Sequence, residues 1–261
     1  MGPFDAILPA GGRISGEYAL EMGTAVKALV KFGNKTVLQH TIEQLRRSSN
    51  VRRIVVIGPN QVLEHPAAGG ADARLLEANT GPENIKNGID YLRGLEQGPL
   101  GPILIVCTDL PFLSAEKLDE FIAKCPEDRD LCIPICTEAE FTRRFQGKKS
   151  MYVQLAEGPL KTGSVFLMSA EVFLRHFDEM QEIFKARKSK WKMASLIGFG
   201  FAFRVVTGRA SLAEVQKRVL DILQCAGEPV KGSPPELAYD IDDLEDYEDA
   251  LEYMGDMANW Q

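Results

Sequence analysis

Two neighbouring glycines and two basic residues near the start of the chain could bind phosphate groups. The segment 8–13 has the sequence LPAGGR, and Lys27 follows it. Gly11 and Gly12 allow backbone N–H groups to come close to an anion, because neither carries a side chain. Arg13 adds a planar fork of donors, and Lys27 adds a point charge. The spacing fits neither a Walker loop nor a Gly-x-Gly-x-x-Gly motif. An ordinary glycine turn with two solvated basic residues is therefore the alternative.

A single aspartate follows the most apolar segment of the chain. Residues 103–107 are apolar at every position and are followed by the sequence TDLPFL. A carboxylate next to a buried strand is costly unless it has a partner. Mg²⁺ prefers one or two carboxylates together with phosphate oxygens. We therefore predict that Asp109 is a metal ligand rather than a helix cap, since Ser114 is the better cap for the helix that follows.

The third segment, residues 239–246, is rich in aspartate. A strand over Ala238–Ile241 would place Asp240 and Asp242 on the same side. Asp242 could then face Asp109 and complete a magnesium site. The alternative is an acidic first turn that stabilises a helix dipole, which is our interpretation of the remaining acidic residues, Asp243, Glu245 and Asp246.

Short apolar runs alternate with helical periodicity along the chain. The clearest predicted strands are Phe4–Leu8, Ile54–Ile57 and Ile103–Cys107, and the weaker ones are Leu131–Cys136, Val165–Met168, Phe203–Val206 and Ala238–Ile241. This alternation predicts an α/β fold with a doubly wound, mainly parallel but mixed sheet. Ligands bind beyond the carboxyl ends of the strands in such sheets, and the three segments above occupy such ends.

Capping patterns and apolar stripes locate the predicted helices. Val37, Leu38, Ile42 and Leu45 lie at helical spacing. Thr80 with Glu83 and Ser211 with Glu214 resemble capping boxes at the start of two further helices. A last helix is expected from Leu244 to about Met254.

The composition is that of an ordinary globular domain, and it argues against several classes of function. We expect one domain over residues 1–261. The net charge of −7 and the lack of a long basic run argue against a nucleic-acid partner. Five cysteines without a Cys-x-x-Cys pair argue against disulfides and zinc. No apolar run reaches the roughly 20 residues of a membrane span, and no signal precedes the first strand, so we expect a cytoplasmic protein without a membrane partner.

Taken together and in order, these motifs resemble the MobA-like NTP transferases. The resemblance rests on LPAGGR, on VKAL followed by FGNKTVLQHTIEQL, on CTDLPFL and on DIDDLEDYEDA, with GPENIKNGIDYL as further support. The nearest likeness is to uncharacterised bacterial NTP transferase-domain proteins. It implies a Rossmann-like fold of the nucleotide-diphospho-sugar transferase type and a nucleotidyltransferase that uses Mg²⁺, an NTP and a small, phosphorylated acceptor. The loop Ile14–Val26 is longer than in the family's pattern, and Val26 replaces its proline.

The resemblance also assigns roles to individual residues. The catalytic residues would be Arg13, Lys27 and Asp109, and the metal ligands Asp109 and Asp242. Nucleotide-binding residues would be Leu8, Ala10, Gly11, Gly12, Arg13, Lys27, Asn84, Lys86 and Thr108. No histidine is needed as a base, and we interpret His40, His65 and His176 as structural or surface residues.

The segment of about residues 138–198 matches the family less well, and we expect it to form an accessory, acceptor-side segment. Gly163 and Ser164 stand at the entry to a predicted strand, where small residues permit close approach. Basic residues beside Trp191 could bind a phosphorylated acceptor: Arg187, Lys188 and Lys190. The alternative is an amphipathic helix in which Trp191 and Met193 pack inward and the basic residues face water.

Two other functions stay open from the sequence. A nucleotide-sugar glycosyltransferase has a related fold, but its metal motif usually places two aspartates around one residue, and Pro111 occupies the second position here. The second alternative function is that of a regulatory domain, which would bind a nucleotide without turning it over. The sequence predicts neither the oligomeric state nor the base of the NTP.

Overall fold

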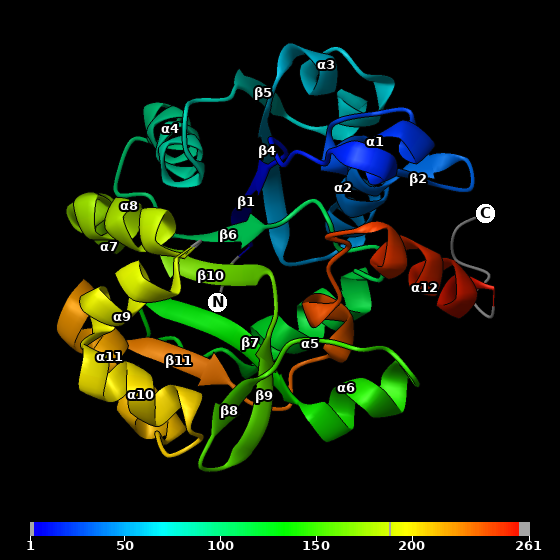
Figure 1. Cartoon of the computed structure of the whole chain (residues 1–261). Helices are drawn as coiled ribbons and strands as arrows, with labels where there is room; N and C mark the ends of the chain where they lie inside the picture. Colours follow the sequence, from blue (N-terminus) through cyan, green and yellow to red (C-terminus); the bar gives the residue numbers. More distant parts are fainter. Residues whose placement is uncertain (1–2, 188, 256–261) are drawn as a thin grey trace.

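A mixed sheet of nine strands, counted over the described residues, forms the centre of the protein (Figure 1). The computed structural model describes residues 3–187 and 189–255. The order in the sheet is β5-β4-β1-β6-β10-β7-β9-β8, and β11 pairs with β7. The strands are β1 (Phe4–Pro9), β4 (Val51–Gly58), β5 (Ala73–Leu76), β6 (Pro102–Val106), β7 (Leu131–Thr137), β8 (Val153–Leu155), β9 (Gly158–Thr162), β10 (Val165–Ser169) and β11 (Gly227–Val230).

The predicted mixed, mainly parallel sheet is confirmed. Strands β1, β4, β5 and β6 pair in parallel, β11 is parallel to β7, and β10 runs antiparallel to both β6 and β7. A separate hairpin is formed by β2 (Lys31–Phe32) and β3 (Lys35–Thr36). The carboxyl ends of β1 and β6 therefore lie at the same edge of the sheet, where the glycine loop and Asp109 follow them.

Two of the weaker strand predictions are wrong. Phe203–Val206 belongs to the helix α10 (Phe199–Val206). Ala238–Ile241 holds the end of the 3₁₀ helix η3 (Pro235–Ala238) and an irregular stretch, so Asp240 and Asp242 are not placed by strand alternation. Strands β2, β3, β5, β8, β9 and β11 were not predicted.

Helices cover both faces of the sheet. On one face Phe4, Ala6 and Leu8 of β1 pack with α2 (Val37–Arg47) and α5 (Ala115–Lys124). On the other face Ile7 packs with α4 (Gly81–Gly94). The latter face is also covered by α7 (Ala170–Arg175), α8 (Phe177–Ala186) and α11 (Leu212–Leu223). The remaining elements are α1 (Gly16–Met22), η1 (Lys27–Leu29), α3 (Asn60–Leu63), η2 (Pro66–Gly70), α6 (Glu138–Arg144), α9 (Lys190–Ile197) and α12 (Leu244–Met254).

Most of the predicted capping signals are present. Ser114 caps α5, and Ser211 with Glu214 forms a complete capping box on α11. Thr80 caps α4 by accepting a hydrogen bond from the Glu83 N–H. The last helix, α12, has the predicted bounds.

The predicted acceptor-side segment, residues 138–198, contributes strands to the main sheet. It supplies β10, which lies between β6 and β7 at the centre of the sheet. It also supplies α6, β8, β9 and α7 to α9. Among the helices of the described residues, none is long and apolar enough to cross a membrane.

A buried histidine anchors the loop that follows β6. His40 on α2 lies with its Nε2 2.7 Å from the carbonyl oxygen of Leu113. Burial lowers the pKa of His40 to about 4, and the hydrogen bond to Leu113 opposes this shift only in part. The imidazole is therefore neutral in the folded protein and donates from Nε2.

Acidification is expected to destabilise the fold through His40. An unfolded chain takes up this proton below a pH of about 6.5, whereas the folded protein does so only near 4. The free energy of unfolding should therefore fall by about 2 kcal/mol between pH 7 and pH 5 on account of this one group. Urea unfolding at both values in the parent and in His40→Gln measures it. An equal loss in both proteins would show that His40 is not responsible.

Candidate active site

The lengthened loop after β1 returns Lys27 to the glycine segment. An isolated bridge pairs Arg13 with Val26, and the Lys27 N–H donates to the Gly12 carbonyl at 2.9 Å. The residues between Arg13 and Val26 include α1, which extends away from this bridge. The additional residues of this loop thus form a helix, and Lys27 lies directly beside the Gly11–Arg13 loop.

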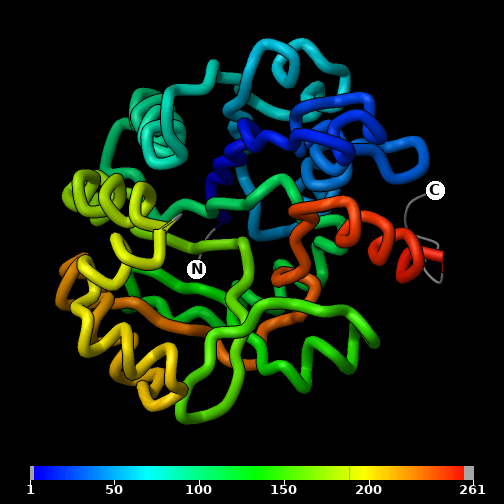
Figure 2. The backbone as a smooth tube through the Cα atoms, in the orientation of Figure 1, coloured from blue at the N-terminus to red at the C-terminus, as the bar shows by residue number. Residues whose placement is uncertain are grey.

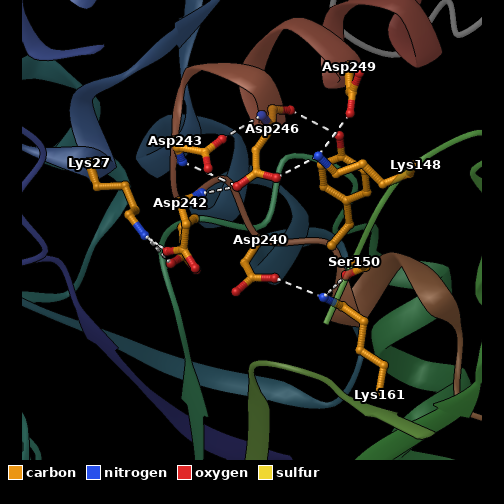
Figure 3. A network of polar contacts seen from close by, with 11 residues as sticks. Lys27, Lys148, Ser150, Lys161, Asp240, Asp242, Asp243, Asp246 and Asp249 are labelled. Carbon is orange, nitrogen blue, oxygen red and sulfur yellow. Dashed lines mark hydrogen bonds and ion pairs between the residues drawn. The ribbon is translucent and has the colours of Figure 1, made fainter. Parts of the chain in front are cut away.

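Lys27 joins two of the predicted site residues. Its Nζ lies 3.2 Å from Asp109 Oδ2 and also forms an ion pair with Asp242 Oδ1. The pair with Asp242 is visible in Figure 3, where Lys27 and Lys161 flank Asp242 and Asp240. Segments from the start, the middle and the end of the chain are thus brought together, as the blue and red parts of the tube in Figure 2 show.

Backbone and aromatic contacts hold the C-terminal aspartates in place. The Ile241 N–H donates to the Asp109 carbonyl at 3.2 Å. The ring of Tyr239 is buried and packs edge-on against Phe112, with 4.8 Å between centroids. Asp246 accepts from the Asp242 N–H at 2.7 Å, which fixes Asp242 at the start of α12. Asp242 therefore reaches Asp109 through a loop, and not through the predicted strand.

Asp240 has a different partner. Its Oδ1 lies 3.5 Å from Nζ of Lys161 on β9, and the same ammonium donates to Ser150 at 2.6 Å. Lys161 also lies over the ring of Phe141. The line of charges therefore runs from Lys27 through the aspartates to Lys161, a second cation that the sequence analysis did not single out.

The charges in the site are strongly coupled. Burial alone would lower the pKa of Lys27, but Asp109 and Asp242 outweigh it and raise that pKa. Burial raises the pKa of Asp109 more than Lys27 lowers it, and Asp240 and Asp242 add to the rise. The aspartates thus form a concentration of negative charge that a single lysine does not fully compensate.

The residues present fit a divalent cation. Asp109 Oδ1 is buried and has no hydrogen-bond partner in the described part of the chain. Asp109 and Asp242 already converge on one small cation, the Lys27 ammonium. No group of three or more Asp, Glu, His or Cys side chains suited to a metal occurs among the described residues. Two carboxylates are nevertheless the protein share expected for Mg²⁺, because substrate phosphates and water fill its other positions.

Arg13 is held by a residue that the sequence analysis did not identify. Its guanidinium forms an ion pair with Glu77, which follows β5, and also donates to the Gly11 carbonyl. A Cβ at Gly11 would displace the Glu77 carboxylate from its present position, so the glycine lets Glu77 lie against the loop. Glu77 lies across the loop and holds Arg13 beside it.

Other predicted nucleotide-binding residues differ in what they can offer. Leu8 and Ala10 have buried side chains, so only their backbone can reach a ligand. The Thr108 hydroxyl donates to the Pro9 carbonyl at 3.3 Å and joins the ends of β1 and β6. Asn84 is buried and accepts from the Ala78 N–H, whereas Lys86 pairs with Asp90 on the outer surface of α4. Asn84 therefore shapes the loop after Glu77, and its contact with a nucleotide stays a prediction.

Packing accounts for the glycine at the predicted acceptor side. A Cβ at Gly163 would lie 2.5 Å from the Leu237 carbonyl oxygen. The N–H groups of Gly163 and Ser164 donate to the carbonyls of Pro134 and Leu237. This turn therefore supports the 237–242 loop, and its contact with an acceptor is untested.

The predicted basic group lies where α8 ends and α9 begins. Arg187 stacks over Phe184, with 3.8 Å from its guanidinium carbon to the ring centroid. Burial raises the pKa of the Cys107 thiol, and Arg187 is close enough to oppose that rise through its charge. Arg187 therefore lies within electrostatic range of the residue that follows β6, whereas Lys190 is exposed at the start of α9 and Lys188 lies outside the described residues. Trp191 is exposed, so the alternative is wrong in packing this ring inward, although Lys190 faces water on a helix as that alternative expects.

The chain is similar in sequence and in fold to known proteins. The family model described as "MobA-like NTP transferase domain" matches residues 6–248. A phosphoenolpyruvate guanylyltransferase of Sphaerobacter thermophilus is 34% identical over 94 residues, which are 35% of this chain and 44% of that protein. The structure of a hypothetical transferase from Thermus thermophilus has a TM-score of 0.81 at 26% identity and covers 94% of this chain and 99% of its own. A 4-diphosphocytidyl-2C-methyl-D-erythritol synthase from Anaerococcus prevotii shares the fold, with a TM-score of 0.59, 11% identity and coverage of 97% and 96%.

Proposed function

Because the chain belongs to the MobA-like NTP transferase family, we propose that it transfers a nucleotidyl group from an NTP to a small anionic acceptor and releases pyrophosphate. The observation that carries this proposal is the convergence of Lys27, Asp109 and Asp242 beside the Gly11–Arg13 loop. Cationic groups for phosphates and carboxylates for a metal stand side by side there, at the edge of the sheet where ligands bind in this type of fold.

The proposed reaction needs positioning and charge stabilisation rather than a covalent intermediate. An acceptor oxygen attacks the α-phosphorus in line, the bond from this phosphorus to the bridging oxygen breaks, and pyrophosphate departs with the electron pair. The N–H groups of Gly11 and Gly12, with Arg13 and Lys27, would neutralise the charge on the leaving group. A phosphate or carboxylate acceptor is already ionised, so no residue has to remove a proton.

Asp109 and Asp242 are the proposed magnesium ligands. When bound, Mg²⁺ would supply positive charge to the phosphate oxygens. Both carboxylates would have to exchange the Lys27 ammonium for the ion, which frees Lys27 to turn toward the phosphates. The proposed site would therefore contain a cation both with and without Mg²⁺, and this cation would offset the repulsion between the two carboxylates.

We place the acceptor between the aspartates and the Lys161–Arg187 side of the site. Lys161 pairs weakly with Asp240, at 3.5 Å, and Arg187 influences the end of β6 through its charge. Together with the predicted residues Gly163, Ser164 and Lys190, they favour an acceptor that carries a phosphate or a carboxylate.

Lys161→Ala is expected to raise the KM for the acceptor about 10- to 100-fold, because a charged hydrogen bond is worth roughly 1.5–3 kcal/mol. The KM for the NTP should stay unchanged, since Lys161 lies on the far side of the aspartates from Lys27. Steady-state kinetics with each substrate varied in turn measures both values.

The exposed neighbour Lys149 provides a matched control, and Lys149→Ala should leave both KM values unchanged. Arg187→Glu and Lys190→Glu test the residues predicted from the sequence in the same assay. A rise in the KM for NTP but not for the acceptor in Lys161→Ala would place Lys161 in the nucleotide half instead.

The proposed activity itself is tested by pyrophosphate release. ATP, GTP, CTP, UTP and dTTP are each combined with pools of sugar 1-phosphates, phosphoalcohols, molybdopterin and phosphoenolpyruvate, with Mg²⁺ present. We expect release that requires one NTP and one pool together. Tight NTP binding without release across the whole panel would favour a regulatory domain over an enzyme.

A further inference from the structure

The helix α10 is apolar on its outer face as well as on its inner face. Phe201 and Val205 point inward and pack with Leu155, Leu160 and Leu212. Phe199, Phe203 and Val206 follow one another at helical spacing on the opposite side and are 58%, 62% and 81% exposed. Trp191 on α9 is 79% exposed, and its ring centroid lies 6.4 Å from that of Phe199. We call the surface formed by Trp191, Phe199, Phe203 and Val206 the α9–α10 face.

This face occurs in the most basic part of an acidic protein. The sequence from Lys185 to Arg209 contains seven basic residues and no acidic residue, although the whole chain has a net charge of −7. Lys185 and Arg204 pair with Glu182 and Glu214. Lys190, Lys192 and Arg209 are exposed and form no ion pair with a described residue. Uncompensated positive charge is therefore carried by residues next to this face in the sequence, since Lys190 and Lys192 flank Trp191 and Arg209 follows Val206.

We propose that the α9–α10 face docks on an anionic lipid bilayer surface. Exposed aromatic residues next to lysine and arginine are the combination that interfacial helices use, with the aromatic side chains at the acyl boundary and the cations at the headgroups. Both helices lie at the periphery of the molecule in Figure 1, so a flat surface can reach them. The proposal differs from the expectation of no membrane partner, which rested on the absence of a spanning segment and of a signal.

The charge pattern favours a bilayer over a second copy of the chain. In a symmetric dimer the α9–α10 face would meet itself and bring like charges together. An anionic lipid surface instead supplies negative charge around every exposed cation. The same property predicts that binding weakens as the salt concentration rises.

The test uses the full chain with Trp260→Phe, which leaves Trp191 as the only tryptophan. Vesicles of phosphatidylcholine with phosphatidylglycerol should shift Trp191 emission to shorter wavelength and sediment the protein, whereas pure phosphatidylcholine should do neither at physiological salt. Brominated lipid chains should quench the emission, because quenching requires contact with the acyl region.

Two groups of variants separate the apolar and the electrostatic contributions. Phe199→Ser with Phe203→Ser should weaken vesicle binding by more than about 10-fold, since each removes exposed apolar area from the interface. Lys192→Glu with Arg209→Glu should remove the preference for the anionic lipid. Leu95→Ser with Met151→Ser is the matched control, because both side chains are exposed and lie outside this face. That control should bind as the parent does.

Three results would overturn the proposal. One is unchanged Trp191 emission and no sedimentation with the anionic vesicles at low salt. The second is equal vesicle binding by Phe199→Ser with Phe203→Ser and by the parent. The third is a dimer in analytical ultracentrifugation that the same two substitutions dissociate, which would assign the α9–α10 face to contact between copies. Circular dichroism should show that the serine variants remain folded, because the substituted rings are largely exposed.

Discussion

Asp109→Ala is expected to reduce nucleotidyl transfer by more than about 10³-fold, the upper range for loss of one preorganised charge-stabilising group. Asp109 stands at the end of the central strand β6, and its Oδ1 is buried without a partner in the described chain. It is the less exposed of the two proposed magnesium ligands, with 20% of its side chain exposed. Asp242, whose side chain is 67% exposed, should matter less, and Asp242→Ala should retain more activity.

The loss should come from the metal site and not from unfolding. Lys27 keeps its ion pair with Asp242 when Asp109 is removed, and one of several crowded negative charges disappears. Thermal unfolding should therefore change little. Calorimetry should show that Mg²⁺ no longer strengthens NTP binding in Asp109→Ala. Asp221→Ala is a matched control, because Asp221 pairs with Lys217 on the surface of α11. Full activity of Asp109→Ala, or undiminished coupling between Mg²⁺ and NTP, would contradict the metal assignment.

Lys27→Ala is expected to lower kcat by about 10²–10³-fold at saturating NTP. The bridge between Arg13 and Val26 fixes the start of η1, so the Lys27 ammonium has a defined position beside the glycine loop. Lys27→Arg keeps the charge and should recover part of the activity, whereas Lys27→Met should not. Rapid quench measurement of a single turnover isolates the chemical step.

Removal of Lys27 should also lower the stability of the metal-free protein. Asp109 and Asp242 then face one another without their shared cation, so the metal-free variant should be less stable than the parent. Added Mg²⁺ should restore that stability without restoring the rate. An unchanged kcat in Lys27→Ala would show that the lysine takes no part in catalysis.

The core of the fold was predictable because the central strands bury both faces. Residues 103–106 are apolar at every position, and β6 contains them. The strand predicted over Phe203–Val206 was wrong because aromatic and β-branched residues favour strands in a short window. With both sides of α10 apolar, no polar face reveals the helical period. Tyr239 was likewise assigned to a strand, although its ring belongs to an aromatic cluster formed only by tertiary packing.

The site was predictable where a residue follows a strand that the sequence reveals. Arg13 and Asp109 are of this kind, whereas Lys27 is separated from β1 by a long loop that contains α1. Glu77 and Lys161 were missed because their roles depend on contacts between residues 64 and 79 positions apart. Strands β5 and β9, which carry or precede them, are short and only half-buried, so their sequences give no clear alternation. Asp242 was predicted to face Asp109 as a second magnesium ligand, and that role stays a prediction. The two aspartates do share the Lys27 ammonium, but a loop and not the predicted strand places Asp242 there.

The most direct test of nucleotidyl transfer follows the phosphorus atoms of the NTP. The protein is incubated with Mg²⁺, the active acceptor pool and NTP labelled with ³²P at either the α or the γ position. Nucleotidyl transfer predicts that the α label enters the acceptor product and that the γ label appears as pyrophosphate, in equal amounts. If the α label stays in free nucleotide while the γ label appears as inorganic phosphate, or if only a sugar nucleotide donates and it transfers its sugar, the proposed function is contradicted.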